Sequence, residues 1–186
     1  MLGAASAFLM LLDFPLPFVP PFVKFDFSEV PIVIAGLLLG PLGGTVTAVL
    51  KILLHLFLRG SVTIGVGELA NLTGSIAYML PAAVLSSKND NSESSVMLLL
   101  CATLCVVLVV VAGNYFVFFP AYARLMGLST DAFVAIGHTA NASITNMKTL
   151  MIYCLLPFNL LKYGITSFIA FPLYRRLKNF RENPTQ

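Results

Sequence analysis

The sequence predicts an all-α integral membrane protein with six transmembrane helices and an irregular Pro-rich loop between helices 1 and 2. Of its 186 residues, 58% are hydrophobic and only 10% are charged. Soluble domains carry about 25% charged residues, so this chain has too little polar surface to remain in water. Trp is absent, and we expect the 15 Phe and 6 Tyr residues to supply the interfacial aromatic side chains.

The first half of the chain contains three of the predicted helices. The first, 1–12, is short, because 1.5 Å per residue gives about 18 Å against a hydrocarbon core of about 30 Å. The segment 13–27, DFPLPFVPPFVKFDF, has four prolines and is predicted to be a non-helical loop. The following uncharged run is interrupted by GPLGG at 40–44, which predicts helices 28–39 and 42–58 joined by a tight turn.

The second half contains the other three helices, separated by two polar or irregular segments. Apolar runs predict helices over 66–85, 96–118 and 148–173. The stretch 86–95, SSKNDNSESS, is predicted to be a polar loop, and 119–146 an irregular segment with a short helix inside it. The six helices are expected to form one domain over 1–186.

Basic residues indicate the orientation in the membrane. The tail RRLKNFR and Lys88 in the polar loop fall on one side of a six-span topology. The positive-inside rule then predicts that both termini are cytoplasmic. The Pro-rich loop and 119–146 face outward on this topology, which predicts a lid over a site open to the outside.

Several classes of function are disfavoured by composition and motifs. The net charge of +3 is small and the basic residues are scattered, so no nucleic-acid partner is expected. The three cysteines lie in apolar runs without neighbouring His or carboxylate residues, which favours packing over a metal site or disulfides. No GxSxG elbow or Walker A loop is present, and no basic residue precedes the first apolar run as in a cleavable signal peptide.

Polar residues within the predicted helices are the candidates for a site, because such residues usually face the protein interior or a cavity. They are Lys51 with His55, Glu68 with Asn71 and Ser75, Asn114 with Tyr115, and Asn159 with Lys162.

Structural interpretations of these residues remain open. An ion pair between two helices is an equally weighted alternative for Lys51 and Glu68. Glu68 is also suited to stabilising the N-terminus of its helix. Asn114 and Asn159 are suited to interhelical hydrogen bonds. Lys162 needs a partner or a polar ligand. Together, these features predict a small helical cup that binds an organic molecule.

Five segments carry a resemblance to a known family: KFDFSEVPIVIAGLLLGPLGG, LKILLHLF, GELANLTGS, GNYFVFFPAY and PFNLLKYG. In this order they resemble the S component, the substrate-binding subunit, of energy-coupling factor (ECF) vitamin transporters. The resemblance runs over nearly the whole chain. Within the family, GELAN and PFNLLK are most similar to the riboflavin-specific members.

The resemblance implies a multi-pass protein of a prokaryotic cell membrane that captures riboflavin outside as a transported substrate. No cofactor, metal or enzymatic activity of its own is implied. The expected partners are riboflavin, the lipid bilayer, a transmembrane coupling subunit and two cytoplasmic ATPase subunits that power release inward. Alternatives are an S component for thiamin, biotin or pantothenate, a small intramembrane enzyme, or a purely structural membrane subunit.

The resemblance also implies site residues. By matching motif, Asn114, Asn159 and Lys162 are expected to bind the polar atoms of riboflavin. The other expected substrate-binding residues are Glu68, Asn71 and Tyr115, with Phe22 and Phe25 of the Pro-rich loop covering the isoalloxazine ring.

Gly3 and Ala7 form a small-xxx-small pair on helix 1. The family resemblance implies that this pair docks on the coupling subunit. Close packing within the bundle is an equally weighted alternative for this pair.

Overall fold

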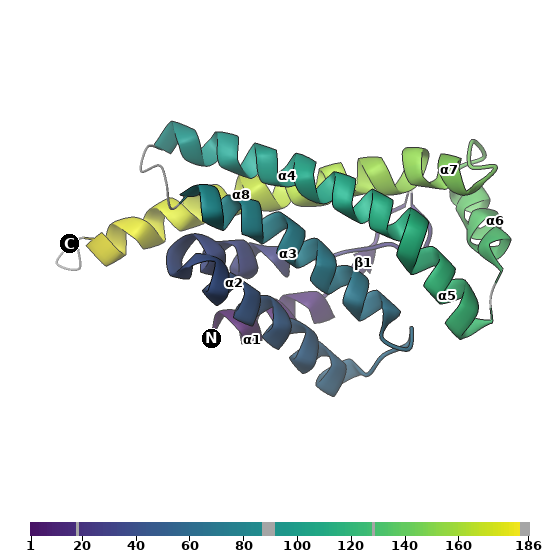
Figure 1. Cartoon of the computed structure of the whole chain (residues 1–186), viewed down its shortest axis with the longest axis horizontal. Helices are drawn as coiled ribbons and strands as arrows, with labels where there is room; N and C mark the ends of the chain where they lie inside the picture. Colours follow the sequence, from purple (N-terminus) through teal and green to yellow (C-terminus); the bar gives the residue numbers. More distant parts are fainter. Residues whose placement is uncertain (18, 87–91, 128, 183–186) are drawn as a thin grey trace.

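The computed structural model describes residues 1–17, 19–86, 92–127 and 129–182. It is a bundle of long helices with a cap of shorter elements at one end (Figure 1). The chain opens with α1, Leu2–Leu11. Helix α1 packs along α2, which is Glu29–Arg59.

The Pro-rich segment between α1 and α2 contains a small antiparallel ribbon. Strand β1, Phe14–Pro15, pairs with β2, Lys24–Phe25. The segment is non-helical as predicted, because each proline removes a backbone donor and clashes with a helical turn. The ribbon itself was not expected from the sequence.

A single residue divides α2 into two parts. Gly40 has φ 81° and ψ 179°, while the residues on either side of it are helical. This backbone conformation is essentially restricted to glycine. The predicted tight turn within GPLGG is therefore confined to one residue, and Pro41 follows it at the start of the second part, where its missing N–H is tolerated.

The remaining helices follow in chain order. They are α3 Val66–Ser86, α4 Ser92–Gly113, the π-helix η1 Asn114–Phe118, α5 Phe119–Met126, α6 Thr130–Ala140, α7 Met147–Leu150, the π-helix η2 Met151–Leu155 and α8 Leu156–Glu182. The predicted polar loop 86–95 lies partly outside the described residues, and its last four residues begin α4.

The prediction that 119–146 is irregular with one short helix inside it was wrong in extent, because two helices, α5 and α6, make up most of this segment. Helix α5 ends at Gly127, whose φ of 65° is left-handed. Helix α6 begins after Ser129, whose side chain accepts a hydrogen bond from the N–H of Ala132. These end signals allow two short helices where the amino-acid composition indicated a loop.

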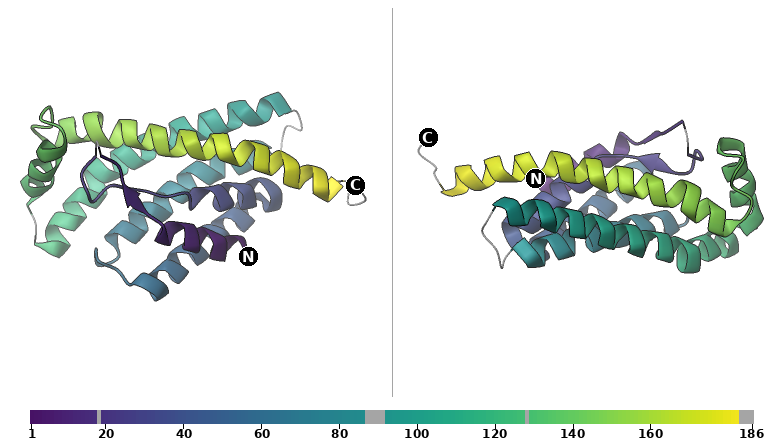
Figure 2. Two further views of the ribbon diagram at one scale, coloured as in Figure 1. Left: turned by 180° about the vertical axis from the view of Figure 1, so that it is seen from behind. Right: turned by 90° about the horizontal axis from the view of Figure 1, so that it is seen from above.

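The helices pack in sequence order around a shared core. Helix α2 packs on α3, α3 on α4, and α4 on α8, which also contacts α2. The two termini lie toward the same end of the bundle, and α6 with the Pro-rich segment lies toward the other (Figures 1 and 2). The Pro-rich segment and the short helices α5, α6 and α7 therefore lie at the end of the bundle away from the termini.

Three helical stretches within the described residues are long and apolar enough to cross a membrane. They are Glu29–Arg59, Met97–Met126 and Met147–Lys178, and α1 is a shorter apolar helix. The all-α architecture agrees with the predicted fold class. The six-span topology stays a prediction.

Candidate ligand-binding site

A pocket of about 450 Å³ lies at the end of the bundle that carries α6 and the Pro-rich segment. Its volume is within the range of about 300–1,000 Å³ that is typical of small-molecule sites. Side chains from seven parts of the chain line it: the Pro-rich segment, the loop between α2 and α3, α3, η1 with α5, α6, η2 and α8. The pocket therefore depends on the fold of nearly the whole chain.

Aromatic rings form one wall of the pocket. Phe22 of the Pro-rich segment meets the rings of Phe119 and Phe133 edge to face, at centroid distances of 6.1 Å and 5.7 Å. Tyr122 and Phe158 also line the pocket. A wall of this kind suits a flat apolar ring system.

Two asparagine amides in the lining are held by their own helices. Asn114 Nδ2 donates to the Val110 carbonyl at 2.8 Å, and Asn159 Nδ2 donates to the Leu155 carbonyl at 2.7 Å. These bonds fix which amide atom faces the backbone, because a carbonyl can only accept. Among the hydrogen bonds of the described residues, none involves the Oδ1 atom of either side chain, so both oxygens remain available as acceptors.

Both π-helices border this pocket. Asn114 is the first residue of η1, and Leu155, which lines the pocket, is the last residue of η2. Short π-helical insertions within α-helices occur frequently at functional sites. The position of both insertions beside one cavity supports its assignment as the site.

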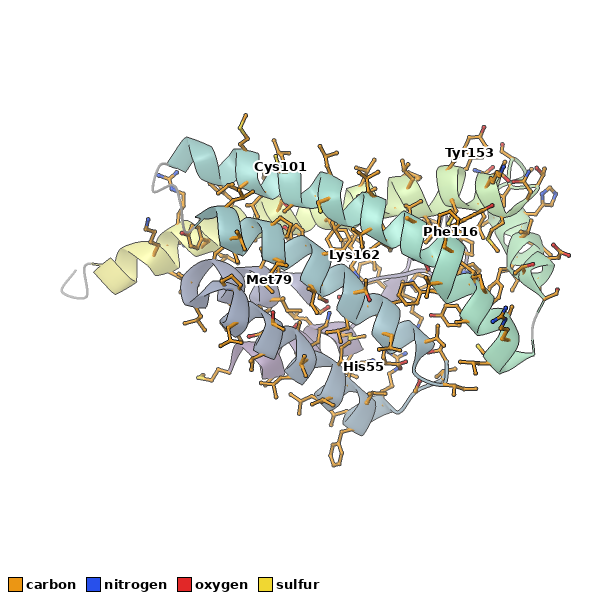
Figure 3. The ribbon with its side chains drawn as sticks, in the orientation of Figure 1. His55, Met79, Cys101, Phe116, Tyr153 and Lys162 are labelled. Atoms are coloured by element: carbon orange, nitrogen blue, oxygen red, sulfur yellow. The ribbon has the colours of Figure 1, made fainter. Side chains whose placement is uncertain are left out.

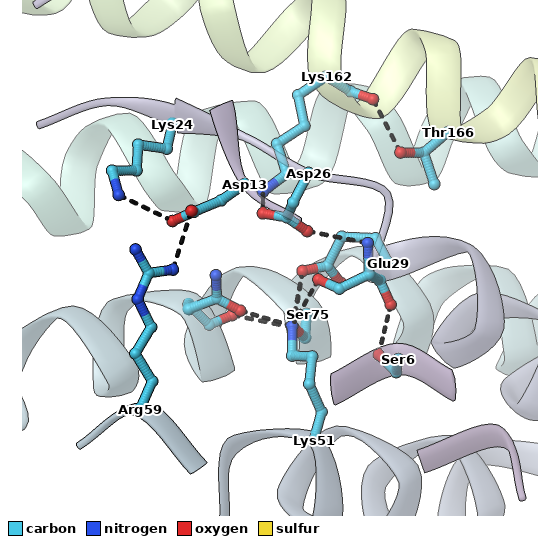
Figure 4. Close-up of polar contacts among 12 residues, drawn as sticks. Ser6, Asp13, Lys24, Asp26, Glu29, Lys51, Arg59, Ser75, Lys162 and Thr166 are labelled. Carbon is cyan, nitrogen blue, oxygen red and sulfur yellow. Dashed lines mark hydrogen bonds and ion pairs between the residues drawn. The ribbon is translucent and has the colours of Figure 1, made fainter. Parts of the chain in front are cut away.

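Lys162 contributes a buried ammonium group to the pocket. Figure 3 shows it inside the bundle, whereas Cys101 and Tyr153 lie at its edge. Lys162 Nζ donates to Asp26 Oδ2 at 2.8 Å, and the backbone N–H of Ser28 donates to Asp26 Oδ1 at 2.8 Å (Figure 4). Asp26 thus ties the Pro-rich segment to α8.

Asp26 is ionised in this environment. Burial acts to raise the pKa of its carboxyl, but the ammonium groups of Lys162 and Lys51 outweigh that effect. Hydrogen bonds from Lys162 and Ser28 add to them, and the pKa falls to about 2.

A second buried ammonium group, Lys51, lies in a polar cluster beneath the pocket. Its Nζ is 2.9 Å from Glu29 Oε1 and 2.7 Å from Ser75 Oγ, and it also donates to Asn71 Oδ1 (Figure 4). Asn71 lines the pocket as well. The suggested ion pair between Lys51 and Glu68 is therefore wrong: Glu29, at the start of the same kinked helix, is the partner.

A third ion-pair cluster lies near the surface at the same end. Asp13 binds Lys24 Nζ at 3.1 Å and Arg59 Nη1 at 2.8 Å. Burial acts to raise the pKa of Asp13, but hydrogen bonds and charges from Arg59 and Lys24 prevail and lower it. This cluster joins the chain after α1, strand β2 and the end of α2.

Metal ligands do not gather anywhere in the described part of the chain. No group of three or more His, Cys, Asp or Glu side chains is placed to hold an ion there. His55 is buried, and its Nδ1 has no hydrogen-bond partner among the described residues.

Comparison with known proteins assigns the family. The family model of the ECF transporter substrate-specific component matches residues 1–174. The chain belongs to this family.

Two relatives of this S component are transporters of known substrate. The riboflavin transporter RibU of Staphylococcus aureus (strain TCH60) is 33% identical over 181 residues, which are 97% of this chain and 88% of RibU. The riboflavin transporter FmnP of Bacillus subtilis (strain 168) is 33% identical over 174 residues, which are 93% of this chain and 85% of FmnP.

A solved structure has the same fold. The S component of a bacterial ECF transporter is 29% identical, with a TM-score of 0.73 that covers 97% of this chain and 92% of the other. The predicted family and the all-α membrane fold class are confirmed.

Five of the eight predicted substrate-binding residues line the pocket of this S component. They are Phe22, Asn71, Asn114, Asn159 and Lys162. The expected donor role of Lys162 is modified by the structure, because Asp26 already accepts one of its hydrogens.

The other three predicted residues lie outside the pocket lining. Glu68 accepts hydrogen bonds from Ser61 Oγ at 2.9 Å and Thr63 Oγ1 at 3.0 Å, so its carboxylate holds the loop before α3. Tyr115 lines a separate groove between α4 and η2. Phe25 is buried in the core, edge to face with Phe158.

The two predicted docking residues are buried against α2. A Cβ atom on Gly3 would lie 2.9 Å from the Cβ of Leu50, and Ala7 is only 1% exposed. The positions of Gly3 and Ala7 in this S component are therefore those of close packing within the bundle, the alternative given above. Their docking role stays a prediction.

Sequence reasoning missed Asp26 as a member of the site. The signal was present in the segment DFSEV, which places two carboxylates just before an apolar helix. Two lysines, Lys51 and Lys162, fall within predicted helices and need counter-charges. Matching these two lysines to the two acids of this segment would have indicated that the acids take part in buried ion pairs.

Proposed function

We propose that this S component binds riboflavin and delivers it inward as the substrate-binding subunit of an ECF importer. One observation carries the proposal: Asn71 of GELAN and Asn159 and Lys162 of PFNLLK, the two motifs most similar to riboflavin-specific members, line one pocket although they come from two distant helices. The naming of both relatives as riboflavin transporters supports the same ligand.

The chemistry of the pocket matches the flavin ring. Its imide edge carries one N–H donor between two carbonyl acceptors. The free Oδ1 atoms of Asn114 and Asn159 are suited to accept from that N–H, while Lys162 Nζ retains hydrogens to donate to a carbonyl. The rings of Phe22, Phe119 and Phe133 offer contacts to the apolar faces of the isoalloxazine.

The place of the pocket in the bundle supports uptake from outside. The pocket lies at the end opposite the termini. With cytoplasmic termini, as the basic tail favours, the pocket opens to the outside of the cell membrane. The sequence contains no Walker A loop, so transport driven by ATP requires the coupling subunit and the ATPase subunits as partners.

A binding assay tests the proposal directly. Purified protein, freed of bound flavin, is titrated with riboflavin while the flavin fluorescence is followed. We expect saturable quenching of the flavin fluorescence, and we expect that thiamin, biotin and pantothenate do not displace the bound riboflavin. Displacement by one of these vitamins, or no quenching at all, would contradict the riboflavin assignment.

The variant Asn159→Ala provides the residue-level test. Loss of a hydrogen bond within a buried site corresponds to about 1–3 kcal/mol, which weakens binding roughly 5- to 150-fold. Leu160→Ala is the matched control, because Leu160 is the adjacent residue on α8 and lies outside the pocket lining. We expect the control to bind riboflavin like the wild type.

A further inference from the structure

An apolar groove lies between α4 and α8, away from the ligand pocket. It has a volume of about 530 Å³, and its walls include Leu100, Phe168 and Phe171. Phe168 and Leu100 are 82% and 58% exposed, so they lie on the outer surface of the bundle. Because Met147–Lys178 is long and apolar enough to cross a membrane, the groove faces the region of the lipid chains.

Two features suit the groove to a hydrocarbon chain. Gly164 opens its floor, since a Cβ atom there would have no heavy atom within 4 Å. Ser167 also lines the groove, but its hydroxyl is bonded internally to Tyr78 at 2.7 Å and Thr103 at 3.0 Å. The floor of the groove therefore has room for a hydrocarbon chain. Its one hydroxyl group, on Ser167, already makes its hydrogen bonds inside the protein.

A positive charge is fixed at one end of the groove. The guanidinium carbon of Arg175 lies 5.6 Å from the centroid of the Phe171 ring, a cation–π contact. Phe171 thus forms a wall of the groove and also positions the guanidinium. Among the salt bridges of the described residues, none involves Arg175, and its planar group is suited to bind a phosphate through two hydrogen bonds.

We propose that this groove binds one acyl chain of an anionic phospholipid, with the lipid phosphate on Arg175. Basic residues at the end of a membrane helix attract anionic headgroups, and Arg176 adds to the local charge. The groove runs along only 164–172 of α8, about 13 Å at 1.5 Å per residue. Such a short hollow fits part of a lipid chain better than a partner helix, which would need a longer surface.

The proposed lipid site is independent of the transported vitamin. The ligand pocket and the groove have no lining residue in common. Riboflavin affinity therefore serves as a folding control for every groove variant, and loss of lipid binding is distinguishable from loss of vitamin binding.

Native mass spectrometry of the purified full chain tests the proposal, with phosphatidylglycerol and phosphatidylcholine added at equal concentration. The wild type is expected to retain one phosphatidylglycerol in preference to phosphatidylcholine. Gly164→Leu, which fills the groove from a position where the Cβ atom meets no other atom, is expected to lose the retained lipid. Arg175→Gln is expected to reduce the preference for phosphatidylglycerol by about fivefold or more, because a charge-assisted contact to the phosphate is lost.

Arg176→Gln is the matched control, because it removes the same charge one residue away without the contact to Phe171. It is expected to keep most of the preference. An equal loss of the phosphatidylglycerol preference in the two arginine variants would show general charge attraction instead of a specific phosphate site. Unchanged lipid retention in Gly164→Leu would contradict the proposed groove site. Weakened assembly of Gly164→Leu with the coupling subunit, with lipid retention intact, would instead assign the groove to a protein partner.

Discussion

Asp26 has more influence on the pocket than its place in a loop would indicate. Its two carboxylate oxygens hold Lys162 on α8 and the backbone N–H of Ser28 just before α2. Both charged side chains are nearly inaccessible, at 5% for Asp26 and 8% for Lys162. Removing one member of such a pair leaves the other charge buried without compensation.

Asp26→Ala is therefore expected to destabilise the protein by about 3–5 kcal/mol, the usual effect of breaking a buried pair from one side. The double variant Asp26→Ala with Lys162→Met is expected to recover part of this loss, because no unpaired charge remains. Thermal unfolding in detergent micelles measures both. Asp131→Ala, at an exposed position on α6, is the control, and equal loss in the single and double variants would contradict the argument.

At the level of elements, the break in α2 depends on one backbone conformation. Gly40 adopts φ 81° and ψ 179°, and a Cβ atom added there would have no heavy atom within 4 Å, so no side-chain clash complicates a substitution. The chain turns back at this break, because a Cβ atom on Gly44 would lie only 2.9 Å from the Cα of Gly36 in the first part of α2.

Gly40→Ala is expected to destabilise the protein by about 1–3 kcal/mol, because this backbone region is strained for any residue with a Cβ atom. The melting temperature of the purified protein reports the effect. Gly164→Ala is the comparison: its methyl group also enters open space, but the backbone there is helical, so stability should be equal or higher. Similar loss in both variants would exclude backbone strain as the cause.

The positions of the long helices could be predicted because uncharged apolar runs are a local signal. The predicted helix 66–85 and the observed helix Val66–Ser86 illustrate this. The pair Asp26–Lys162 spans 136 positions in the sequence. A contact of that kind is made by tertiary packing, which explains why the lysine was recognised as unusual but its partner was not.

Short elements could not be predicted for a different reason. The cap on α6 requires Ser129 to adopt an extended backbone while its side chain accepts from Ala132. The ribbon pairs Phe14 with Phe25 across a turn that contains several prolines. Composition indicates a loop in both places, because these signals depend on a few residues and their geometry.

For the molecule as a whole, ion pairs join separate elements at the pocket end. Asp13 connects the chain after α1 to Lys24 and Arg59, and Asp26 connects the Pro-rich segment to Lys162. The opposite end contains the termini. The carboxylates of these ion pairs are therefore concentrated at the end of the bundle where the ligand pocket lies.

This concentration predicts acid sensitivity. The pKa of Asp26 is lowered to about 2 in the fold and that of Asp13 is also lowered, whereas unfolded Asp titrates near a pKa of about 3.9. Stabilisation from these groups is thus complete above about pH 4 and is lost as the pH falls toward about 2.

Thermal unfolding from about pH 7 to about pH 3 is expected to show a constant contribution from these pairs down to about pH 4 and a decline below it. Asp26→Ala should reduce that decline, because the variant has one fewer carboxyl to protonate. An equal decline in wild type and variant would show that other groups dominate the acid response.

The π-helices have a consequence for how related chains are compared. A π-turn contains about one residue more than an α-turn, so η1 shifts the helical phase of α5 relative to α4, and η2 does the same for α8 relative to α7. A chain with one residue fewer at either place would have similar hydrophobicity but turn different side chains toward the pocket. A single-residue deletion in either segment is therefore expected to change which side chains line the pocket.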